Sequence, residues 1–289
     1  MIRSKITVLI PVKDDPKTIK CVASIDAEAH IVIVFNGAKQ DFVHSIKDSL
    51  KSRDIDYHEL PHPNLSWALE YGIRHAPSNL VLMMDSDCEF VPGAIESFYD
   101  IAEKYDTKSN VFKGDVIFQK GNSYMSKVIA KSRFHHTAEV LTAYKPPLLV
   151  DKRIRNMIGG YFFDDRLVWR EDSDFDNRIR QAGIGIIPVE AGKIKHGSLS
   201  MLTDFRSTFR YGIGLAIADV LHIKLTEVPR SVISTLMSQG IAPALYMIFR
   251  NRIYDLGYWI TRYQIFTKKR TLNESPNIDY PYTSQSHVT

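Results

Sequence analysis

Residues 79–92 read NLVLMMDSDCEFVP, and this stretch decides the fold prediction. Its apolar run, residues 80–84, is typical of a strand that is buried on both faces of a parallel sheet. The run ends abruptly in an Asp-Ser-Asp motif, Asp85 to Asp87. In open α/β sheets ligands bind outside the carboxyl ends of the strands, and paired carboxylates there favour a divalent cation that substrate phosphates share. A surface turn is the alternative, because Asp and Ser are also common in turns.

The chain around this stretch alternates between strand-like and helix-like segments. Strands are predicted at 6–12, 30–35, 55–60, 79–84, 110–118 and 184–190. Helices are predicted at 17–27, 41–52, 65–76, 93–104, 122–144 and 171–182. This alternation predicts an α/β fold with a mostly parallel sheet, helices on both of its faces and right-handed crossovers.

The character of the sequence changes near residue 200. Residues 203–222 and 228–266 lack the rhythm of strands and turns and are predicted to be helical. Breaks within them are expected at Gly240, Pro243 and Gly257. The last residues are polar, which predicts a flexible tail. The predicted parts are a sheet domain, a helical C-terminal extension and a tail, at 1–200, 201–270 and 271–289.

Composition places the chain among soluble globular proteins. It has 289 residues, of which 44% are hydrophobic and 24% charged, as is ordinary for that class. The two cysteines, Cys21 and Cys88, lie far apart and form neither a disulfide framework nor a zinc pattern, so a reducing cytoplasm is expected. The sequence shows no signal peptide and no apolar stretch long enough for a transmembrane helix.

Charge is unevenly distributed along the chain. Residues 205–270 hold ten Lys/Arg and three acids, a net charge of +7, whereas the remainder sums to −3. This asymmetry predicts that the C-terminal part faces something anionic. No nucleic-acid-binding motif accompanies the charge, which argues against nucleic acid. Residues 234–270 combine aromatic and basic residues as interfacial helices do, which predicts peripheral membrane contact. A helical cap packed on the sheet domain and a homodimer interface are the alternatives.

A second acidic cluster, WREDSDFDNRIRQAGIGI, covers residues 169–186. Glu171 and Asp172 begin the predicted helix, where acids are also favourable for electrostatic reasons alone. One of these carboxylates could reach the crevice beside Asp87 and accept a proton from an attacking hydroxyl. His196 follows a strand-like segment. It could be a metal ligand, a phosphate donor or a polar core residue.

Four segments carry a resemblance to a known family. They are TVLIPVKDDP, IVIVFNGA, NLSWALEYGIRHAPSNLVLMMDSDCEFVPGAIE and GGYFFDDRLVWREDSDFDNRIRQAGIGI. In this order and spacing, over about residues 5–200, they resemble glycosyltransferase family 2. The resemblance implies a GT-A fold, a Rossmann-like, mostly parallel mixed sheet flanked by helices. It also implies inverting transfer of a sugar from a nucleoside-diphosphate sugar.

The resemblance further implies roles for single residues. Asp87 would bind a Mn²⁺ or Mg²⁺ ion that bridges the nucleotide diphosphate, and Asp85 would contact the ribose or the metal shell. His196 would lie near the diphosphate or the metal. Asp172 would be the catalytic base, with Glu171 supporting it or contacting the acceptor.

The donor-binding part of the resemblance contains a departure. Pro11, Val12 and Asp14 would border the nucleobase and ribose. Many members end the second strand with an Asp that recognises the base, whereas this chain has Phe35 followed by Asn36. Phe35 could stack or pack, and Asn36 could hydrogen-bond the base. The identity of the nucleobase is therefore left open.

The predicted function is metal-dependent glycosyl transfer in polysaccharide or glycoconjugate biosynthesis, in the cytoplasm or at the inner face of its membrane. The acceptor would be a glycan, a lipid-linked molecule or a small molecule. A nucleotidyltransferase of similar fold is one alternative, but residues 11–17, PVKDDPK, contain no glycine for a phosphate loop. A catalytically inactive, membrane-associated protein that binds sugar nucleotides is another, but its acidic set would be broken, and here it is complete.

Overall fold

The computed structural model describes residues 6–25, 28–133, 141–167, 169–228, 231–269 and 272. Apart from Leu272, the predicted tail lies outside these residues, as does the 134–140 part of the predicted helix 122–144. The described strands are β1 (Ile6–Val12), β2 (His30–Asn36), β3 (Ile55–Leu60), β4 (Leu80–Met83), β5 (Cys88–Phe90), β6 (Asn110–Phe118), β7 (Leu148–Asp151) and β8 (Gly185–His196). The described helices are α1 (Thr18–Ala23), α2 (Gln40–Ser49), α3 (Leu65–His75), α4 (Ala94–Lys104), α5 (Tyr124–Ser132), the 3₁₀ helix η1 (Lys152–Ile158), α7 (Glu171–Gln181), α8 (Met201–Val220), α9 (Val232–Gln239) and α10 (Ile241–Phe266).

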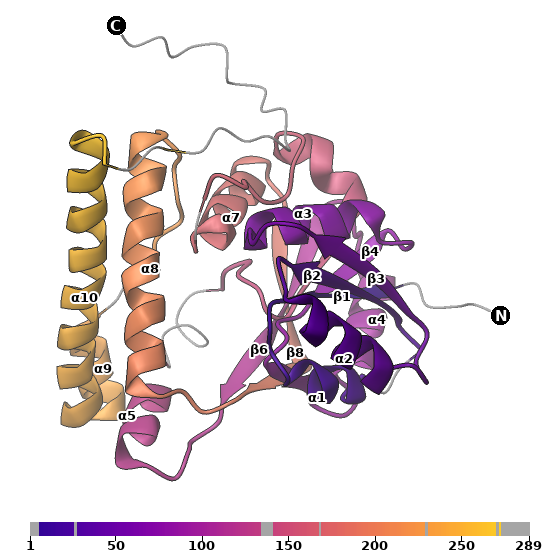
Figure 1. Ribbon diagram of the computed structural model, residues 1–289, viewed down its shortest axis with the longest axis horizontal. Helices are drawn as coiled ribbons and strands as arrows, with labels where there is room; N and C mark the ends of the chain where they lie inside the picture. The colour runs from indigo at the N-terminus through magenta and orange to yellow at the C-terminus, as the bar shows by residue number, and fades with distance from the viewer. Residues whose placement is uncertain are drawn as a thin grey trace, which may run out of the picture.

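The strands form one eight-stranded sheet in the order β3-β2-β1-β4-β7-β6-β8-β5. Strands β1 to β4 run parallel to one another. Strand β7 pairs antiparallel with both β4 and β6, so the sheet is mixed. Helices α1, α2 and α4 lie on one face of the sheet, and α3 and α7 lie toward the other (Figure 1). The predicted α/β class is confirmed.

Strand β1 shows why the opening apolar run folds as it does. Val8, Ile10 and Val12 belong to one hydrophobic core, together with residues of α1, α2 and α4. Leu9 belongs to the second core, on the opposite face, together with residues of α3 and α7. Because successive side chains of a strand point to opposite faces, a strand covered on both sides needs apolar side chains on both of its faces.

The sheet brings the aspartate motif to His196. Strands β1, β2 and β4 end at the same edge, with Val12 opposite Phe35 and Leu9 opposite Met83. The chain then turns through the motif into β5, which pairs antiparallel with the end of β8. In this pairing Cys88 lies opposite His196. Strand β8 is longer than predicted, and its extra length carries His196 to the edge where β4 ends.

The predicted helix at 122–144 is confirmed over α5, which ends at Ser132, and is wrong at residues 141–144. The described residues 141–147 contain no helix. The sequence there is Lys145-Pro146-Pro147, and proline disfavours helical conformation both at its own position and at the preceding residue. This loop carries Lys145 to the site described below.

The break predicted at Gly240 is confirmed, but α10 runs through Pro243 and Gly257. Pro243 is the third residue of α10, where no intrahelical hydrogen bond is lost. Gly257 faces α8, and a Cβ there would lie 2.2 Å from the Phe209 carbonyl oxygen. A Cβ on Gly212 of α8 would likewise lie 2.1 Å from the carbonyl oxygen of Tyr254 on α10. These two glycines let the helices pack backbone against backbone.

Helices α8 and α10 stand side by side and beside the sheet, with α5 and α9 at one end of the pair (Figure 1). Among the helices in the described ranges, none is both long enough and apolar enough to cross a lipid bilayer. The division of the chain near residue 200 stays a prediction.

Candidate active site

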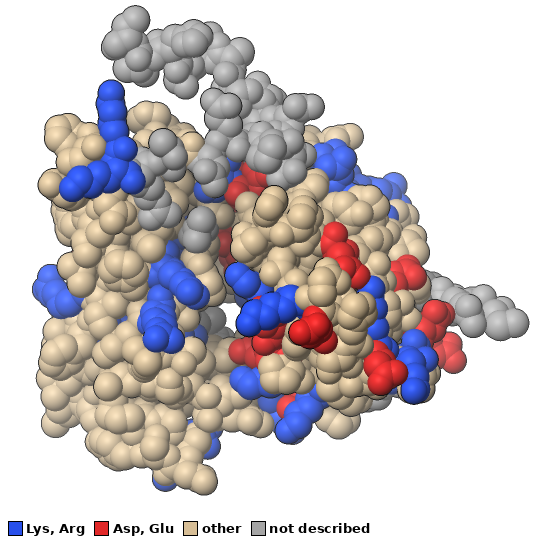
Figure 2. Space-filling model, viewed as in Figure 1, with Lys and Arg blue, Asp and Glu red and all other residues tan. Residues whose placement is uncertain are grey.

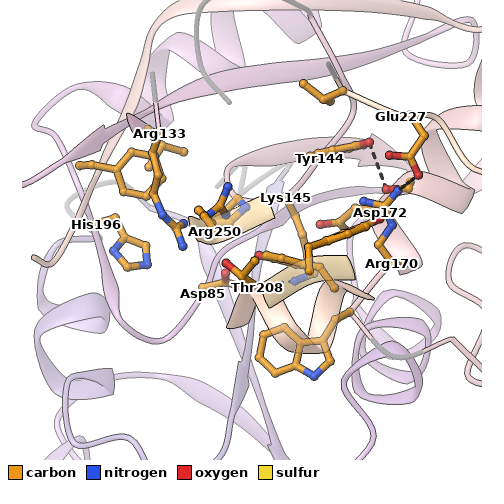
Figure 3. A pocket seen from close by; sticks show the side chains of 18 of the residues that line it. Asp85, Arg133, Tyr144, Lys145, Arg170, Asp172, His196, Thr208, Glu227 and Arg250 are labelled. Atoms are coloured by element: carbon orange, nitrogen blue, oxygen red, sulfur yellow. Dashed lines mark hydrogen bonds and ion pairs between the residues drawn. The ribbon is translucent and has the colours of Figure 1, made fainter. Parts of the chain in front are cut away.

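A cavity opens between the sheet and the C-terminal helices (Figure 3). It encloses about 1160 Å³ of empty space, its open mouth included. Strand β6, the loop before β7, the start of α7, and helices α8 and α10 all contribute side chains to it. Its charged lining residues and its histidine are Asp85, Lys113, Arg133, Lys145, Arg170, Asp172, His196, Glu227 and Arg250. Three of the predicted site residues, Asp85, Asp172 and His196, therefore share one cavity.

Asp87 and His196 face each other beside this cavity. The distance from Asp87 Oδ2 to His196 Nε2 is 3.4 Å. His196 Nδ1 lies 2.8 Å from the Gly197 carbonyl oxygen, which can only accept, so Nδ1 carries a hydrogen. In the neutral ring Nε2 is then an acceptor that faces a carboxylate. Two acceptors that face each other fit a divalent cation between them, and a ligating histidine usually donates its other N–H in this way.

Cys88 places its Sγ beside Asp87 and His196, as a third atom that could bind a metal. Ligand atoms of Asp87, Cys88 and His196 all lie within 4.8 Å of one another. Burial raises the pKa of the Cys88 thiol, and Asp85 and Asp87 raise it further. The thiol therefore stays protonated and donates to Asp87 Oδ1 at 3.6 Å. The donor set is thus one of oxygen and imidazole nitrogen, which suits Mn²⁺ or Mg²⁺ better than a thiophilic ion.

Lys145 joins the aspartate motif to the start of α7. Its Nζ lies 3.5 Å from Asp85 Oδ1 and 3.7 Å from Glu171 Oε1, and its side chain is 5% exposed. Burial alone would lower the pKa of Lys145, but Asp85, Asp172 and Glu171 raise it above its ordinary value. Lys145 is therefore a permanent cation among three carboxylates. Lys145 was not among the site residues predicted from the sequence, because nothing local distinguishes it from a surface lysine.

Asp172 has the environment of a proton acceptor. Burial raises the pKa of its carboxyl, Lys145 opposes the rise, and Glu171 and Asp85 add to it. Within the described part of the chain, Asp172 Oδ1 and Glu171 Oε2 are buried without a hydrogen-bond partner. The Asp172 carboxylate is therefore only partly neutralised, opens on a cavity and has a raised pKa. These properties suit general-base catalysis.

Lys113 lines the same cavity as Lys145. Its Nζ donates to the Pro146 carbonyl oxygen at 2.8 Å. Burial lowers the pKa of Lys113 to about 8, although Asp172, Asp115 and Asp85 act to raise it. This amine therefore changes its charge just above neutral pH, next to the predicted base.

The residues predicted to border the nucleotide lie at the ends of β1 and β2, outside the cavity wall. Pro11 and Val12 are buried within β1. Asp14 is exposed, has a φ of 49°, and accepts a hydrogen bond from the Lys39 N–H at 2.9 Å. Their contact with a nucleotide stays a prediction.

Asn36 and Phe35 have structural partners. The Asn36 side-chain oxygen accepts the backbone N–H of Asn64 at 2.6 Å, and the Asn64 side chain caps α3. Phe35 is 1% exposed and stacks on Tyr57, with ring centroids 6.0 Å apart. Phe35 therefore packs in the core. The side-chain N–H₂ of Asn36 could still donate a hydrogen bond to a base.

Comparison with known proteins identifies the family. The sequence model of glycosyl transferase family 2 matches residues 7–162, more than half of the chain. The chain therefore belongs to glycosyl transferase family 2, and it is a glycosyltransferase that uses a sugar nucleotide. This finding confirms the resemblance and decides against the nucleotidyltransferase alternative. A search of curated protein sequences gives no match.

Solved structures with the GT-A fold are similar to this one. The mannosyltransferase PcManGT from Pyrobaculum calidifontis, solved with GDP-Man and Mn²⁺, shares 12% identity at a TM-score of 0.57, over 93% of this chain and 80% of its own. Residues 1–349 of TarS from S. aureus share 11% identity at a TM-score of 0.52, over 93% of both chains. The TarS complex with UDP-GlcNAc shares 13% at 0.52, over 91% of this chain and 92% of its own. At identities this low, the structural similarity shows a shared fold and no more.

Proposed function

We propose that the protein moves a sugar from a nucleoside-diphosphate sugar to an acceptor hydroxyl, with inversion and with the help of a divalent cation. The observation that carries this proposal is the meeting of two acidic groups, one after β4 and one at the start of α7, in one cavity. Lys145 contacts both groups, since it lies 3.5 Å from Asp85 and 3.7 Å from Glu171. The acids after β4 would thus lie near the leaving group and those of α7 near the attacking hydroxyl, within reach of one lysine.

The residues divide the reaction between them. Asp87 and His196 would hold Mn²⁺ or Mg²⁺, with Asp85 beside them, and the bound cation would neutralise the leaving diphosphate as a Lewis acid. Asp172 takes the proton of the acceptor hydroxyl, whose oxygen bonds to the anomeric carbon as the bond to the diphosphate breaks. Attack from the face opposite the diphosphate inverts that carbon. One base suffices because the donor is already activated, whereas a glycosidase needs a flanking pair.

The donor would lie along the strand ends. The carboxyl ends of β1 and β2 place Pro11, Val12, Asp14 and Asn36 at the edge where β4 ends. Such a crevice at strand ends is where nucleotides bind in open α/β sheets. The similar structures were solved with donors of different base, GDP-Man and UDP-GlcNAc. Both guanosine and uridine donors therefore belong in the test.

The test is a thermal-shift panel of nucleoside diphosphates and sugar nucleotides, each with and without Mn²⁺ or Mg²⁺. At a ligand concentration of 100 times Kd we expect about 2.7 kcal/mol of stabilisation for the matching nucleotide with metal. Asp87→Ala should lose the metal-dependent part. Asp48→Ala, whose side chain is 80% exposed on α2, is the matched control. Unchanged stabilisation of Asp87→Ala would refute the ligand role, and the anomer of the product, read by NMR, tests inversion.

The outer face of the C-terminal helices supports the predicted membrane contact. Large apolar residues on α9 and α10 that are more than a third exposed are Ile233, Leu236, Met237, Ile241, Leu245, Ile248, Phe249, Leu256, Trp259, Ile260, Tyr263 and Phe266. Those on α10 follow one another at helical spacing, with one interval of seven residues between Phe249 and Leu256, and so form one stripe. Figure 2 shows the side of the molecule over α8 and α10 as largely uncharged, with scattered basic residues, whereas acids gather over the sheet.

This stripe, together with the basic residues near it, fits the surface of an anionic membrane. Arg252, Arg262, Lys268 and Lys269 lie on α10 or directly after it, and each basic residue near such a surface adds about 1 kcal/mol of attraction. Trp259 and Tyr263 suit the headgroup region. The enzyme would then work at the inner face of the cytoplasmic membrane, near a lipid-linked or glycan acceptor.

Flotation on vesicles tests this contact. The wild-type protein should float with vesicles that contain phosphatidylglycerol and much less with pure phosphatidylcholine. Trp259→Gln with Phe266→Gln should abolish flotation, because these side chains are 67% and 87% exposed. Met157→Gln, at an exposed apolar residue of η1, should leave it unchanged. A lipid-free dimer that the double variant breaks would point to a homodimer interface instead.

A further inference from the structure

Two buried arginines share a single carboxylate at one end of the cavity. Arg133, directly after α5, donates its Nε–H to Asp204 Oδ1 at 2.9 Å. Arg250, on α10, places its Nε 3.2 Å from Asp204 Oδ2. The Tyr246 hydroxyl donates to the same Oδ2 at 2.6 Å. Asp204 thus fastens α5, α8 and α10 together.

This cluster carries a surplus positive charge. Arg133 is 8% exposed, Arg250 is 3% exposed and Asp204 is fully buried. Counting only the residues that the structure describes, Asp204 is the sole carboxylate paired with either arginine. Arginine remains protonated in proteins, so two charges of +1 meet one of −1. A buried charge without a counterion is costly, and an anionic ligand would supply that counterion.

The electrostatic environment of Arg250 agrees with this count. Burial lowers the pKa of Arg250, Asp204 acts to raise it, and the charge of Arg133 lowers it again. Against the effect of burial, Asp204 raises the pKa of Arg133 above its ordinary value, but at Arg250 it does not outweigh burial and the charge of Arg133. In addition, Arg250 Nε is buried without a hydrogen bond in the described structure.

The two arginines open on the cavity and form a group separate from Lys145. Both line the cavity, and Figure 3 shows their guanidinium groups between His196 and Lys145. The carboxylates that act on the pKa of Lys145 are Asp85, Asp172 and Glu171. The largest influences on the pKa of Arg250 are instead burial, Asp204 and Arg133. The cavity thus has Lys145 as the cation among the acids, and Arg133 and Arg250 as a second cationic group on its helical wall.

We propose that Arg133 and Arg250 form a subsite for a phosphate group of the acceptor. The proposal rests on the proposed function, which places the donor diphosphate at the ends of β1, β2 and β4, whereas these arginines come from the helical side of the cavity. Guanidinium groups bind phosphate oxygens through paired, charge-assisted hydrogen bonds. Asn251, the next residue along α10, also lines the cavity and offers amide donors. The acceptor would then be a phosphorylated molecule that presents a hydroxyl toward Asp172.

Calorimetric titration of the full chain with inorganic phosphate, at constant ionic strength, tests the subsite. The decisive titration is made with a nucleoside diphosphate and Mg²⁺ already saturating, so that the donor site is filled. We expect phosphate still to bind, and Arg250→Met to weaken this binding about tenfold or more, as for the loss of a charge-assisted hydrogen bond. Arg133→Met should also weaken phosphate binding. In each variant the remaining arginine and Asp204 still form a pair without net charge.

Arg252→Met is the matched control, because Arg252 lies two residues further along α10 with its side chain 80% exposed. It should bind phosphate as the wild type does. Three results would overturn the proposal: no phosphate binding, equal binding by all variants, or full competition between phosphate and the nucleoside diphosphate, which would assign the arginines to the donor. Phosphate binding in a protein that responds to no nucleoside diphosphate would support the subsite and count against the proposed function.

Discussion

Lys145 is the residue whose replacement should disturb the site most. Its Nζ lies 3.5 Å from Asp85 and 3.7 Å from Glu171, and Asp172 acts on it as well. Lys145→Met keeps most of the aliphatic volume and removes the charge. Three carboxylates would then face one another near Lys113, which itself has a pKa of about 8 because of burial.

The expected loss of stability follows from this geometry. Removal of one partner of a buried ion pair costs about 3–5 kcal/mol. Both distances are longer than an ideal ion-pair contact, and the Asp85 side chain is 33% exposed, so solvent screens part of the loss. We therefore expect a decrease of about 2–3 kcal/mol in the free energy of unfolding at pH 7.5. Lys51→Met, which removes a fully solvated partner of Asp48, should change it by less than about 1 kcal/mol.

The effect should depend on pH with a defined sign. Burial raises the folded-state pKa of Asp172, so its contribution to stability is complete below the unfolded pKa, about 3.9, and is lost as pH rises through the folded value. Without Lys145 that folded value rises further, whereas Lys145 itself, with its raised pKa, stays charged throughout this range. The deficit of Lys145→Met should therefore grow between pH 4.5 and pH 7.5 in urea denaturation. An equal deficit at both pH values would refute this reasoning.

Three further substitutions test the site and the helices that cover it. Asp172→Asn should lower kcat about 10²–10⁴-fold with donor binding retained. It should also raise the free energy of unfolding at pH 7.5, because the substitution replaces a buried acid with a raised pKa by a neutral amide. Turnover near that of the wild type would exclude Asp172 as the base. His196→Ala should weaken Mn²⁺ binding, measured by calorimetry, about tenfold or more; unchanged affinity would exclude it as a ligand. Gly257→Ala should destabilise the fold by about 1–3 kcal/mol, since the new Cβ would lie 2.2 Å from the Phe209 carbonyl oxygen. Arg206→Ala, at an exposed position of α8, should not destabilise it. Identical melting curves for the two variants would contradict the close packing of α8 and α10.

The sheet could be predicted from the sequence because its signals are local. Strands β3 and β6 begin and end where the pattern places them, at 55–60 and 110–118. The buried strand before Asp85 also follows from a local apolar run, and an acid pair at a strand end has few structural explanations. The predicted roles of these acids stay predictions, but the sequence was sufficient to select residues that the fold brings to one cavity.

The rest of the cavity could not be predicted, because it depends on packing between distant segments. Lys145 directly follows the segment predicted as helix, 122–144, and lies in a loop that continues into two prolines. Arg133 and Arg250 are 117 positions apart, and they meet through Asp204 on a third helix. No spacing in the sequence links these residues. The sequence predicts helices over both C-terminal segments, but not which polar groups they enclose.

The basic surplus of the C-terminal part therefore divides into two features with different consequences. Arg250 points inward to Asp204 and is 3% exposed, whereas Arg252, two residues on, has a side chain that is 80% exposed and lies within the apolar stripe of α10. Positions two apart on a helix do not share a face, so one helix offers positive charge both to the cavity and to the surroundings. Both features lie outside the 7–162 segment that the family model matches. If the proposals hold, the choice of acceptor depends on helices α8 and α10 together with Arg133, which lies within that segment. Replacement of Arg250 should then change the use of phosphate without changing vesicle binding, and replacement of Trp259 with Phe266 should do the reverse.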